Sequence, residues 1–133
     1  MISRRIAIFA ALGVAFYPVY RALAASDPDL LLRLDTDRDA TVSLDEAKKA
    51  ADAMFDKLDR DHDGTLTRGE LRGRLSANEF TAADIDKDGT ISKGEYLAVV
   101  EHRFKAADAD NDGTLTRQEL KTKAGRQLLR LLR

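Results

Sequence analysis

The stretch DADNDGTLTRQE, from Asp108 to Glu119, has aspartate at every other position three times, turns on a glycine and ends in glutamate. Four carboxylates within twelve residues repel one another. An acidic run that alternates along a curled loop directs its aspartates inward, and the glutamate returns from the helix that follows. The pattern therefore predicts a site for a hard cation that prefers oxygen ligands.

The same pattern occurs four times along the chain. The stretches DTDRDATVSLDE, DRDHDGTLTRGE and DIDKDGTISKGE begin at Asp35, Asp59 and Asp84, and the stretch from Asp108 is the fourth. Their starts lie 24, 25 and 24 residues apart, and together they hold 17 of the 23 acidic residues. A repeat of this kind sets the organisation of the chain, so secondary structure is predicted from it.

Each stretch, here called loops 1 to 4, offers the same set of oxygen ligands. These are the aspartates at positions 1, 3 and 5, the backbone carbonyl at position 7 and the glutamate at position 12. Calcium takes about six to eight oxygens and accepts a bidentate glutamate, whereas magnesium demands a tighter octahedron, so the predicted ion is Ca²⁺. The candidate ligands are Asp35, Asp37, Asp39, Thr41 and Glu46; Asp59, Asp61, Asp63, Thr65 and Glu70; Asp84, Asp86, Asp88, Thr90 and Glu95; and Asp108, Asp110, Asp112, Thr114 and Glu119.

Position 6 requires a sharp turn, which glycine makes without steric cost. Loops 2 to 4 have Gly64, Gly89 and Gly113 there, but loop 1 has Ala40. A left-handed alanine costs on the order of 1 kcal/mol. Loop 1 is therefore expected to bind its ion more weakly, and the extra acid at Asp45 is not expected to restore the turn.

A helix-capping box, in which Ser or Thr at position 9 precedes the glutamate by three residues, also occurs in every loop. Capping explains these two residues but gives no reason for three alternating aspartates. We therefore expect the glutamate to cap its helix when the loop is empty and to bind the ion when it is full. The boxes are Ser43 with Glu46, Thr67 with Glu70, Ser92 with Glu95 and Thr116 with Glu119.

The loops resemble the calcium-binding loops of the EF-hand family. Loops 2 to 4 match the motif D-x-[DN]-x-[DN]-G-x5-E fully, and loop 1 matches it except at the glycine. The resemblance covers residues 27–133, and the close spacing is similar to that of compact exported bacterial members with four loops. It implies an all-α fold of helix–loop–helix repeats that binds calcium without catalysis. All four loops have an apolar residue at position 8: Val42, Leu66, Ile91 and Leu115.

Only 12, 13 and 12 residues separate successive loops, so one short helix must serve two of them. A helix of about 12 residues is about 18 Å long, which places its two loops at opposite ends. Alternating helices then predict that loop 1 pairs with loop 3, and loop 2 with loop 4. Alternatively, Gly73 and the capping box of Ser76 and Glu79 split the third helix and free its halves to rearrange. The helices are expected at 28–36, 45–58, 69–83, 94–107 and 118–132.

The first 24 residues have the order of a secretory signal peptide. Cleavage is expected before Ala25, which leaves a four-loop domain of residues 25–133, periplasmic or secreted. An uncleaved membrane anchor is the alternative, but the apolar run is shorter than the ~20 residues that cross a bilayer. The general secretory route fits better than twin-arginine export, because calcium-coupled folding favours a chain that crosses unfolded. The segment contains in order Arg4 and Arg5, the apolar run 6–17, Pro18 and Ala22-Leu23-Ala24.

Composition argues against several classes of function. The net charge is −1, and becomes −4 without residues 1–24, so nucleic-acid binding is not expected. No cysteine is present, which removes disulfides, thiol catalysis and zinc–thiolate sites. His62 and His102 lack the spacing of a transition-metal site, and no nucleophile has a histidine partner nearby, so catalysis is not expected.

The expected function is therefore that of an exported protein that binds up to four Ca²⁺ ions, with binding coupled to folding, as a buffer or structural component. The alternative is a sensor or adaptor that exposes a surface for a protein or membrane partner. Sensors of this kind use grooves rich in methionine, and only Met54 follows the leader, which favours the buffer.

The C-terminal stretch KTKAGRQLLRLLR, from Lys121, carries five basic residues and no acid, with leucines at helical spacing. One interpretation is a helix that contacts a membrane surface or a partner. The other is a closing helix that packs on the core, with its basic residues favoured by the helix dipole. We predict the second.

Overall fold

The computed structural model describes residues 28–133, and every structural statement below concerns this part of the chain. The chain divides into two units, residues 1–30 and 31–133, and the fold described here is that of the second. The predicted signal segment of residues 1–24 and its cleavage position lie outside the described residues.

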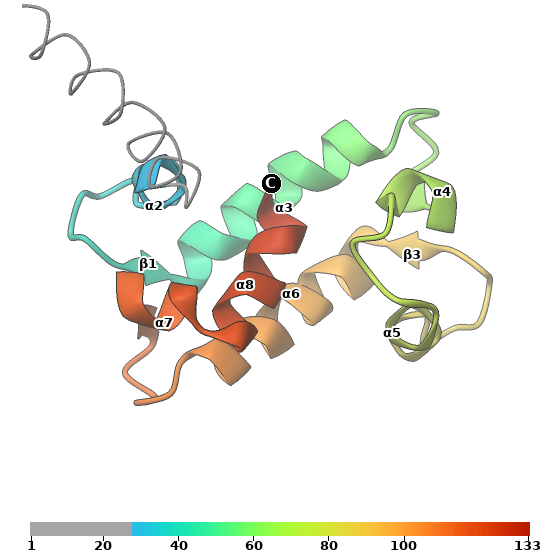
Figure 1. The fold of residues 1–133 in the computed structure, drawn as a ribbon. Helices are drawn as coiled ribbons and strands as arrows, with labels where there is room; N and C mark the ends of the chain where they lie inside the picture. Colours follow the sequence, from blue (N-terminus) through green and yellow to red (C-terminus); the bar gives the residue numbers. More distant parts are fainter. Residues whose placement is uncertain (1–27) are drawn as a thin grey trace, which may run out of the picture. The chain divides into compact units, whose positions relative to one another are not determined.

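Helices dominate the described residues, and the strands are two-residue segments inside the loops (Figure 1). The all-α fold class is thus confirmed. No helix within residues 28–133 has the length and apolar character needed to span a bilayer. The elements are α2 (Pro28–Leu34), β1 (Val42–Ser43), α3 (Leu44–Leu58), β2 (Thr65–Leu66), α4 (Arg68–Leu71), α5 (Ala77–Ala83), β3 (Ile91–Ser92), α6 (Lys93–Ala107), β4 (Thr114–Leu115), α7 (Arg117–Lys121) and α8 (Lys123–Leu132).

The two long helices, α3 and α6, begin and end at the loops as the sequence predicts. Each has 15 residues and starts one residue before its expected position. Ser43 and Ser92 cap their first turns, and Asp59 and Asp108, the first residues of the next loops, close their last turns. At about 1.5 Å per residue each helix is about 22 Å long, so the loops that it joins lie at opposite ends.

Helices α3 and α6 pack against each other in antiparallel orientation (Figure 1). Near the end of α3, the Phe55 ring meets the Tyr96 ring at the start of α6 edge-on, with centroids 5.8 Å apart. Towards the other end, the Lys48 ammonium lies 3.1 Å from the Glu101 carboxylate. Because of this orientation, loops 1 and 4 lie at one end of the helix pair and loops 2 and 3 at the other.

The loops pair accordingly through their short strands. Strand β1 of loop 1 pairs with β4 of loop 4, and β2 of loop 2 pairs with β3 of loop 3, both antiparallel. The prediction that loop 1 pairs with loop 3, and loop 2 with loop 4, is therefore wrong. It treated the segment 69–83 as one helix that separates loops 2 and 3.

That segment is broken, as the alternative prediction at Gly73 states. Helix α4 ends at Leu71; its C-cap Arg72 has φ 51°, and Gly73 follows with φ 76°. These left-handed residues turn the chain, and Ser76 then caps α5 through the Glu79 backbone N–H. Because the chain reverses direction at this break, loops 2 and 3 lie side by side. A continuous helix over residues 69–83 would have placed these successive loops at its opposite ends.

The last expected helix, 118–132, is also broken, and this was not predicted. Thr122 is extended, with φ −66° and ψ 167°, between α7 and α8. Its hydroxyl donates to the Glu119 carbonyl at 2.6 Å and accepts from the Gly125 backbone N–H at 3.1 Å. A Cβ at Gly125 would lie 2.2 Å from the Glu119 carbonyl oxygen, so only glycine allows this close packing of α8 on α7.

Helix α8 packs against both α3 and α6 (Figure 1). Leu128 and Leu131 are fully buried. The Tyr96 hydroxyl donates to the Leu131 carbonyl at 2.5 Å, and the buried Arg103 guanidinium donates to the Gln127 carbonyl at 2.6 Å. The prediction of a closing helix that packs on the core is confirmed.

Candidate metal centres

The aspartate at position 1 anchors each loop from the end of the preceding helix. All four are buried, with at most 9 % of their surface exposed. In loop 2, the Asp59 carboxylate accepts the backbone N–H groups of Asp63 at 3.2 Å and of Gly64 at 2.9 Å. These bonds curl the backbone around the carboxylate, which holds a buried charge at the centre of the turn.

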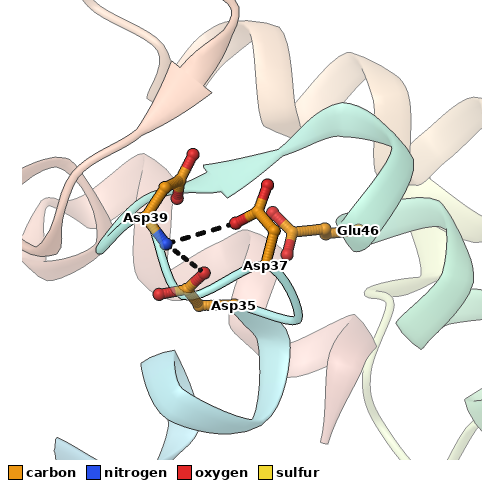
Figure 2. Close-up of side chains that lie close together, drawn as sticks. All are labelled: Asp35, Asp37, Asp39 and Glu46. Atoms are coloured by element: carbon orange, nitrogen blue, oxygen red, sulfur yellow. Dashed lines mark hydrogen bonds between the residues drawn. The ribbon is translucent and has the colours of Figure 1, made fainter.

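Side chains at positions 1, 3 and 12 converge in every loop. In each case their ligand oxygens lie within 4.8 Å of one another. In loop 1 the carboxylate at position 5 joins them, and Figure 2 shows its four side chains around the turn, with the Asp39 N–H donating to Asp35 and Asp37. The clusters are Asp35, Asp37, Asp39 and Glu46; Asp59, Asp61 and Glu70; Asp84, Asp86 and Glu95; and Asp108, Asp110 and Glu119.

Loops 2 to 4 do not bring the aspartate at position 5 into the cluster. In loop 2, an oxygen of Asp63 accepts the Thr65 backbone N–H at 2.9 Å and its hydroxyl at 3.0 Å. Asp88 and Asp112 bind the threonine two residues later in the same way. Asp39 makes the same two bonds in loop 1 and still joins its cluster, so the bonds brace the loop without excluding position 5 from it. The ligand role of the position 7 carbonyls remains a prediction.

The glutamate at position 12 caps its own helix in all four loops. In loop 4 the Glu119 carboxylate accepts the Thr116 backbone N–H at 2.8 Å and its hydroxyl at 3.1 Å. The Thr116 hydroxyl in turn accepts the Glu119 N–H. The capping half of the expected double role is therefore present in every loop. To bind an ion with both carboxylate oxygens, the glutamate has to give up these capping hydrogen bonds.

The surroundings of the loop aspartates shift their pKa values in opposite directions at positions 3 and 5. Desolvation and a hydrogen bond shared with Asp59 raise the pKa of Asp61, and the charges of Asp63 and Glu70 add to this. The Thr65 backbone N–H and hydroxyl lower the pKa of Asp63. The same alternation occurs in the other loops. Each loop thus holds one carboxylate, at position 3, whose charged form is less favoured than that of an ordinary aspartate.

Loop 1 forms the same turn as the other loops without glycine. Ala40 has φ 67°, close to the 79° of Gly64, and its N–H donates to Asp35 at 2.9 Å. The expectation of a left-handed alanine at position 6 is confirmed. Position 4 is also left-handed in every loop, which sequence reasoning missed because only His62 and Asn111 are of residue types enriched in that conformation. The four residues are Arg38, His62, Lys87 and Asn111.

Loop 1 also contains a contact that the motif does not predict. The Thr36 backbone N–H and hydroxyl both donate to the Glu46 carboxylate. Burial disfavours the charge of Glu46, but the N–H groups of Ser43 and Thr36 and their hydroxyls outweigh it and lower its pKa to about 2. In loop 3 the backbone of Ile85 makes a related bond to Glu95, at 3.1 Å. In loops 1 and 3, position 2 therefore helps to fix the glutamate, and no feature of the sequence marked it.

The donor set of the loops fits a hard divalent cation. All side chains that converge are carboxylates, the ligands that calcium and magnesium prefer. In loop 4, the Asp108 Oδ1 atom is buried and has no hydrogen-bond partner among the described residues. Its counterparts in the other loops accept the N–H of position 5. An uncompensated buried carboxylate oxygen is costly, and a cation at this position would satisfy it.

Comparison with protein-family models identifies three of these four loops. A family model described as EF hand matches residues 51–76, 75–100 and 100–122, each containing one complete loop. Together the matches run over more than half of the chain. Loop 1 lies outside the matched range. No curated protein matches the chain. With three consecutive EF-hand repeats and a fourth acidic loop of the same geometry, the chain belongs to the EF-hand family.

Proposed function

We propose that this protein is an exported calcium-binding protein that holds up to four Ca²⁺ ions and whose folding is coupled to binding. The observation that carries the proposal is the convergence of carboxylate oxygens within 4.8 Å in all four loops. Mutual repulsion of like charges at this separation destabilises the empty loops, and a bound cation relieves it.

The choice of calcium rests on the kind and arrangement of ligands. The clusters contain no histidine or cysteine, which disfavours zinc and copper. A glutamate at position 12 can supply two oxygens, and the loop backbone is adaptable, which suits the larger and irregular shell of calcium. Magnesium keeps a tighter octahedron and is expected to bind the same loops more weakly.

Coupling of binding to folding follows from the distribution of charge. The loops hold 17 of the 23 acidic residues, and position 1 of each is buried next to two other carboxylates. The paired strands bring two loops together at each end of α3 and α6. Cations relieve this repulsion only in the folded arrangement, so binding stabilises it relative to the unfolded chain.

A buffer or structural role is favoured over a sensor by the covering of apolar surface. Helix α8 occupies the surface formed by α3 and α6, and Tyr96 and Arg103 bind its backbone. Among the described residues, only Leu32 and Ile85 are large apolar residues with high exposure. This leaves little apolar surface for a target.

A sensor or adaptor role is the second candidate, and one feature favours it. A pocket of about 400 Å³ lies between α5, α6 and α8, and its wall combines alanines, Val99 and Ile85 with charged and polar side chains. Exposed Ile85 and the Glu95 side chain of loop 3 are part of its wall. A change at Glu95 on ion binding would therefore reshape a pocket that can accept an apolar side chain. Calcium-dependent binding of a hydrophobic dye would favour this role over the buffer.

Export is proposed from the leader predicted for residues 1–24. A protein whose folding requires calcium folds after it reaches a compartment rich in calcium, and the general secretory route carries unfolded chains. The predicted product is residues 25–133 outside the cytoplasmic membrane. Mass determination of the protein recovered from cell fractions would test both the cleavage position and the compartment.

Calcium titration calorimetry tests the central proposal. The full chain is titrated with Ca²⁺ and Mg²⁺, and circular dichroism is recorded in chelator and in calcium. Binding at three or four sites, with a large gain in helix signal, is the expected result. No calcium heat and no spectral change would overturn the proposed function, whereas strong binding to a chain already folded in chelator would overturn only the coupling.

A further inference from the structure

Helix α8 presents a row of basic side chains to solvent. They are spaced three, four and three residues apart, so they lie along one face of the helix. All four are exposed. At about 1.5 Å per residue the row is about 15 Å long. This row, called the basic stripe below, consists of Lys123, Arg126 and Arg130 of α8 and of Arg133, the C-cap of the helix.

Packing of the opposite face fixes the stripe outward. Leu128, Leu131 and Leu132 are buried against the core. The Tyr96 hydroxyl holds the Leu131 carbonyl, and the Arg74 guanidinium donates to the Arg133 carbonyl at 2.7 Å. The apolar side of α8 is thus engaged within the chain, and what it offers to a partner is charge rather than apolar surface.

Nothing in the described part of the chain neutralises the stripe. None of its four side chains forms an ion pair with a carboxylate of residues 28–133, and residues 120–133 contain no acid. The acidic residues are concentrated in the loops instead. The stripe is therefore available to an external anionic surface.

The number of ions bound in the loops sets the net charge of the protein. This net charge determines whether the protein as a whole attracts or repels an anionic surface near the basic stripe. Residues 25–133 carry a net charge of −4 and the full chain −1, so three divalent ions reverse the sign of the first and one ion that of the second. Empty loops repel an anionic surface, and filled loops do not. The affinity of the stripe for such a surface is thus linked to the ions, although the stripe contains no ligand.

We propose that the basic stripe of α8 binds the surface of an anionic phospholipid membrane, and that calcium in the loops strengthens this binding. The calcium dependence rests on the proposed function. Three of the four residues are arginines, whose planar guanidinium groups bind phosphate oxygens in pairs. A straight row on one exposed helix face fits a flat surface, and it has no aromatic side chain for stacking on bases of a single strand.

Vesicle binding of the full chain tests the proposal. Sedimentation is measured with vesicles of phosphatidylcholine alone and of phosphatidylcholine mixed with phosphatidylglycerol, in calcium and in chelator. We expect binding to require phosphatidylglycerol, to rise with calcium and to fall with added salt. Arg126→Gln with Arg130→Gln is expected to weaken binding on the order of tenfold to thirtyfold.

A matched control removes the same charge from another helix. Lys49→Gln with Lys57→Gln neutralises two exposed residues of α3 that form no ion pair within residues 28–133, and it should bind vesicles nearly as the wild type does. Circular dichroism in calcium checks that both double variants fold. The apolar segment 6–17 is common to all of them, and vesicles of phosphatidylcholine alone report its contribution.

Calorimetry without vesicles separates this inference from the proposed function. Normal calcium binding together with equal vesicle binding by both double variants would overturn the membrane site and leave the calcium function intact. Absence of calcium heat would overturn the proposed function and, with it, the calcium dependence of membrane binding. Tighter binding to a duplex DNA oligomer than to anionic vesicles at equal salt would replace the membrane by nucleic acid as the partner.

Discussion

Val42 and Leu115 are paired across the antiparallel strands β1 and β4, and both are fully buried. This contact joins the first loop to the last. It closes one end of the α3–α6 pair, and the contact of Leu66 with Ile91 closes the other. A substitution at Val42 should therefore be coupled energetically to residues of loop 4 and not to residues of loop 3.

A double-mutant cycle tests this pairing. Val42→Ala and Leu115→Ala should each lower the free energy of unfolding by about 1 to 4 kcal/mol, since both remove buried apolar atoms. Their effects should be coupled by at least about 0.5 kcal/mol, whereas Val42→Ala and Ile91→Ala should be additive. Denaturant unfolding in calcium measures all three. Coupling of Val42 to Ile91 instead would restore the pairing of loops 1 and 3.

Replacing the left-handed Ala40 by glycine should strengthen calcium binding at loop 1. Ala40→Gly removes a conformational cost on the order of 1 kcal/mol, which corresponds to about fivefold tighter calcium binding at that loop. The reverse change, Gly64→Ala, should weaken loop 2 by a similar factor, because a Cβ there has open space and only φ 79° is unfavourable. Calcium titration of the two variants provides the comparison, and unchanged affinities would show that the turn does not limit binding.

Glu95→Gln should separate capping from ion binding in loop 3. Glutamine can still accept the Ser92 N–H, so the helix start is kept, but it lacks the charge and the two equivalent oxygens of a bidentate ligand. Calorimetry should show one site fewer, with an unchanged spectrum in chelator. Glu101→Gln, the same change outside the loops, should keep the full number of sites. A full set of sites in Glu95→Gln would remove this glutamate from the ligands.

Ionised Glu46 should contribute to the acid stability of the ion-free folded chain, which an osmolyte such as TMAO added to the chelator buffer populates. Its pKa is lowered from 4.5 to about 2 in the folded chain, so its contribution is present above about pH 4.5 and is lost as the pH falls towards 2. Wild type should therefore lose more stability over this range than Glu46→Gln does. Denaturant unfolding at several pH values measures the difference, and parallel curves would contradict the hydrogen bonds assigned to Glu46.

Gly125→Ala should loosen α8. The new Cβ would lie 2.2 Å from the backbone oxygen of Glu119, so the helix has to shift, at a cost of about 1 to 3 kcal/mol. Gly94→Ala in α6 serves as the control, because nothing lies within 4 Å of its Cβ. It should leave stability unchanged or raise it by up to about 1 kcal/mol. Thermal unfolding in calcium distinguishes the two, and equal midpoints would argue against the close packing of α7 and α8.

The sequence by itself determined the loops and the helices that adjoin them. Asp108 and Glu119 act within one turn and its following helix, so their roles are local and can be inferred from spacing. The boundaries of α3 and α6 follow from the same cause, since a capping box starts each helix and the first aspartate of the next loop ends it. The break at Gly73 was foreseen as an alternative because glycine and a capping box are both local signals.

Only the tertiary structure decided which loops pair and where α8 lies. All four residues at position 8 are apolar, so the sequence pattern does not distinguish them and does not indicate which loops pair. The pairing follows instead from the antiparallel packing of α3 and α6, which depends on contacts between distant residues such as Phe55 and Tyr96. Likewise, local propensity predicts one continuous helix over residues 118–132, but the chain bends at Thr122. The bend is favoured because it buries Leu128 and Leu131 against the core.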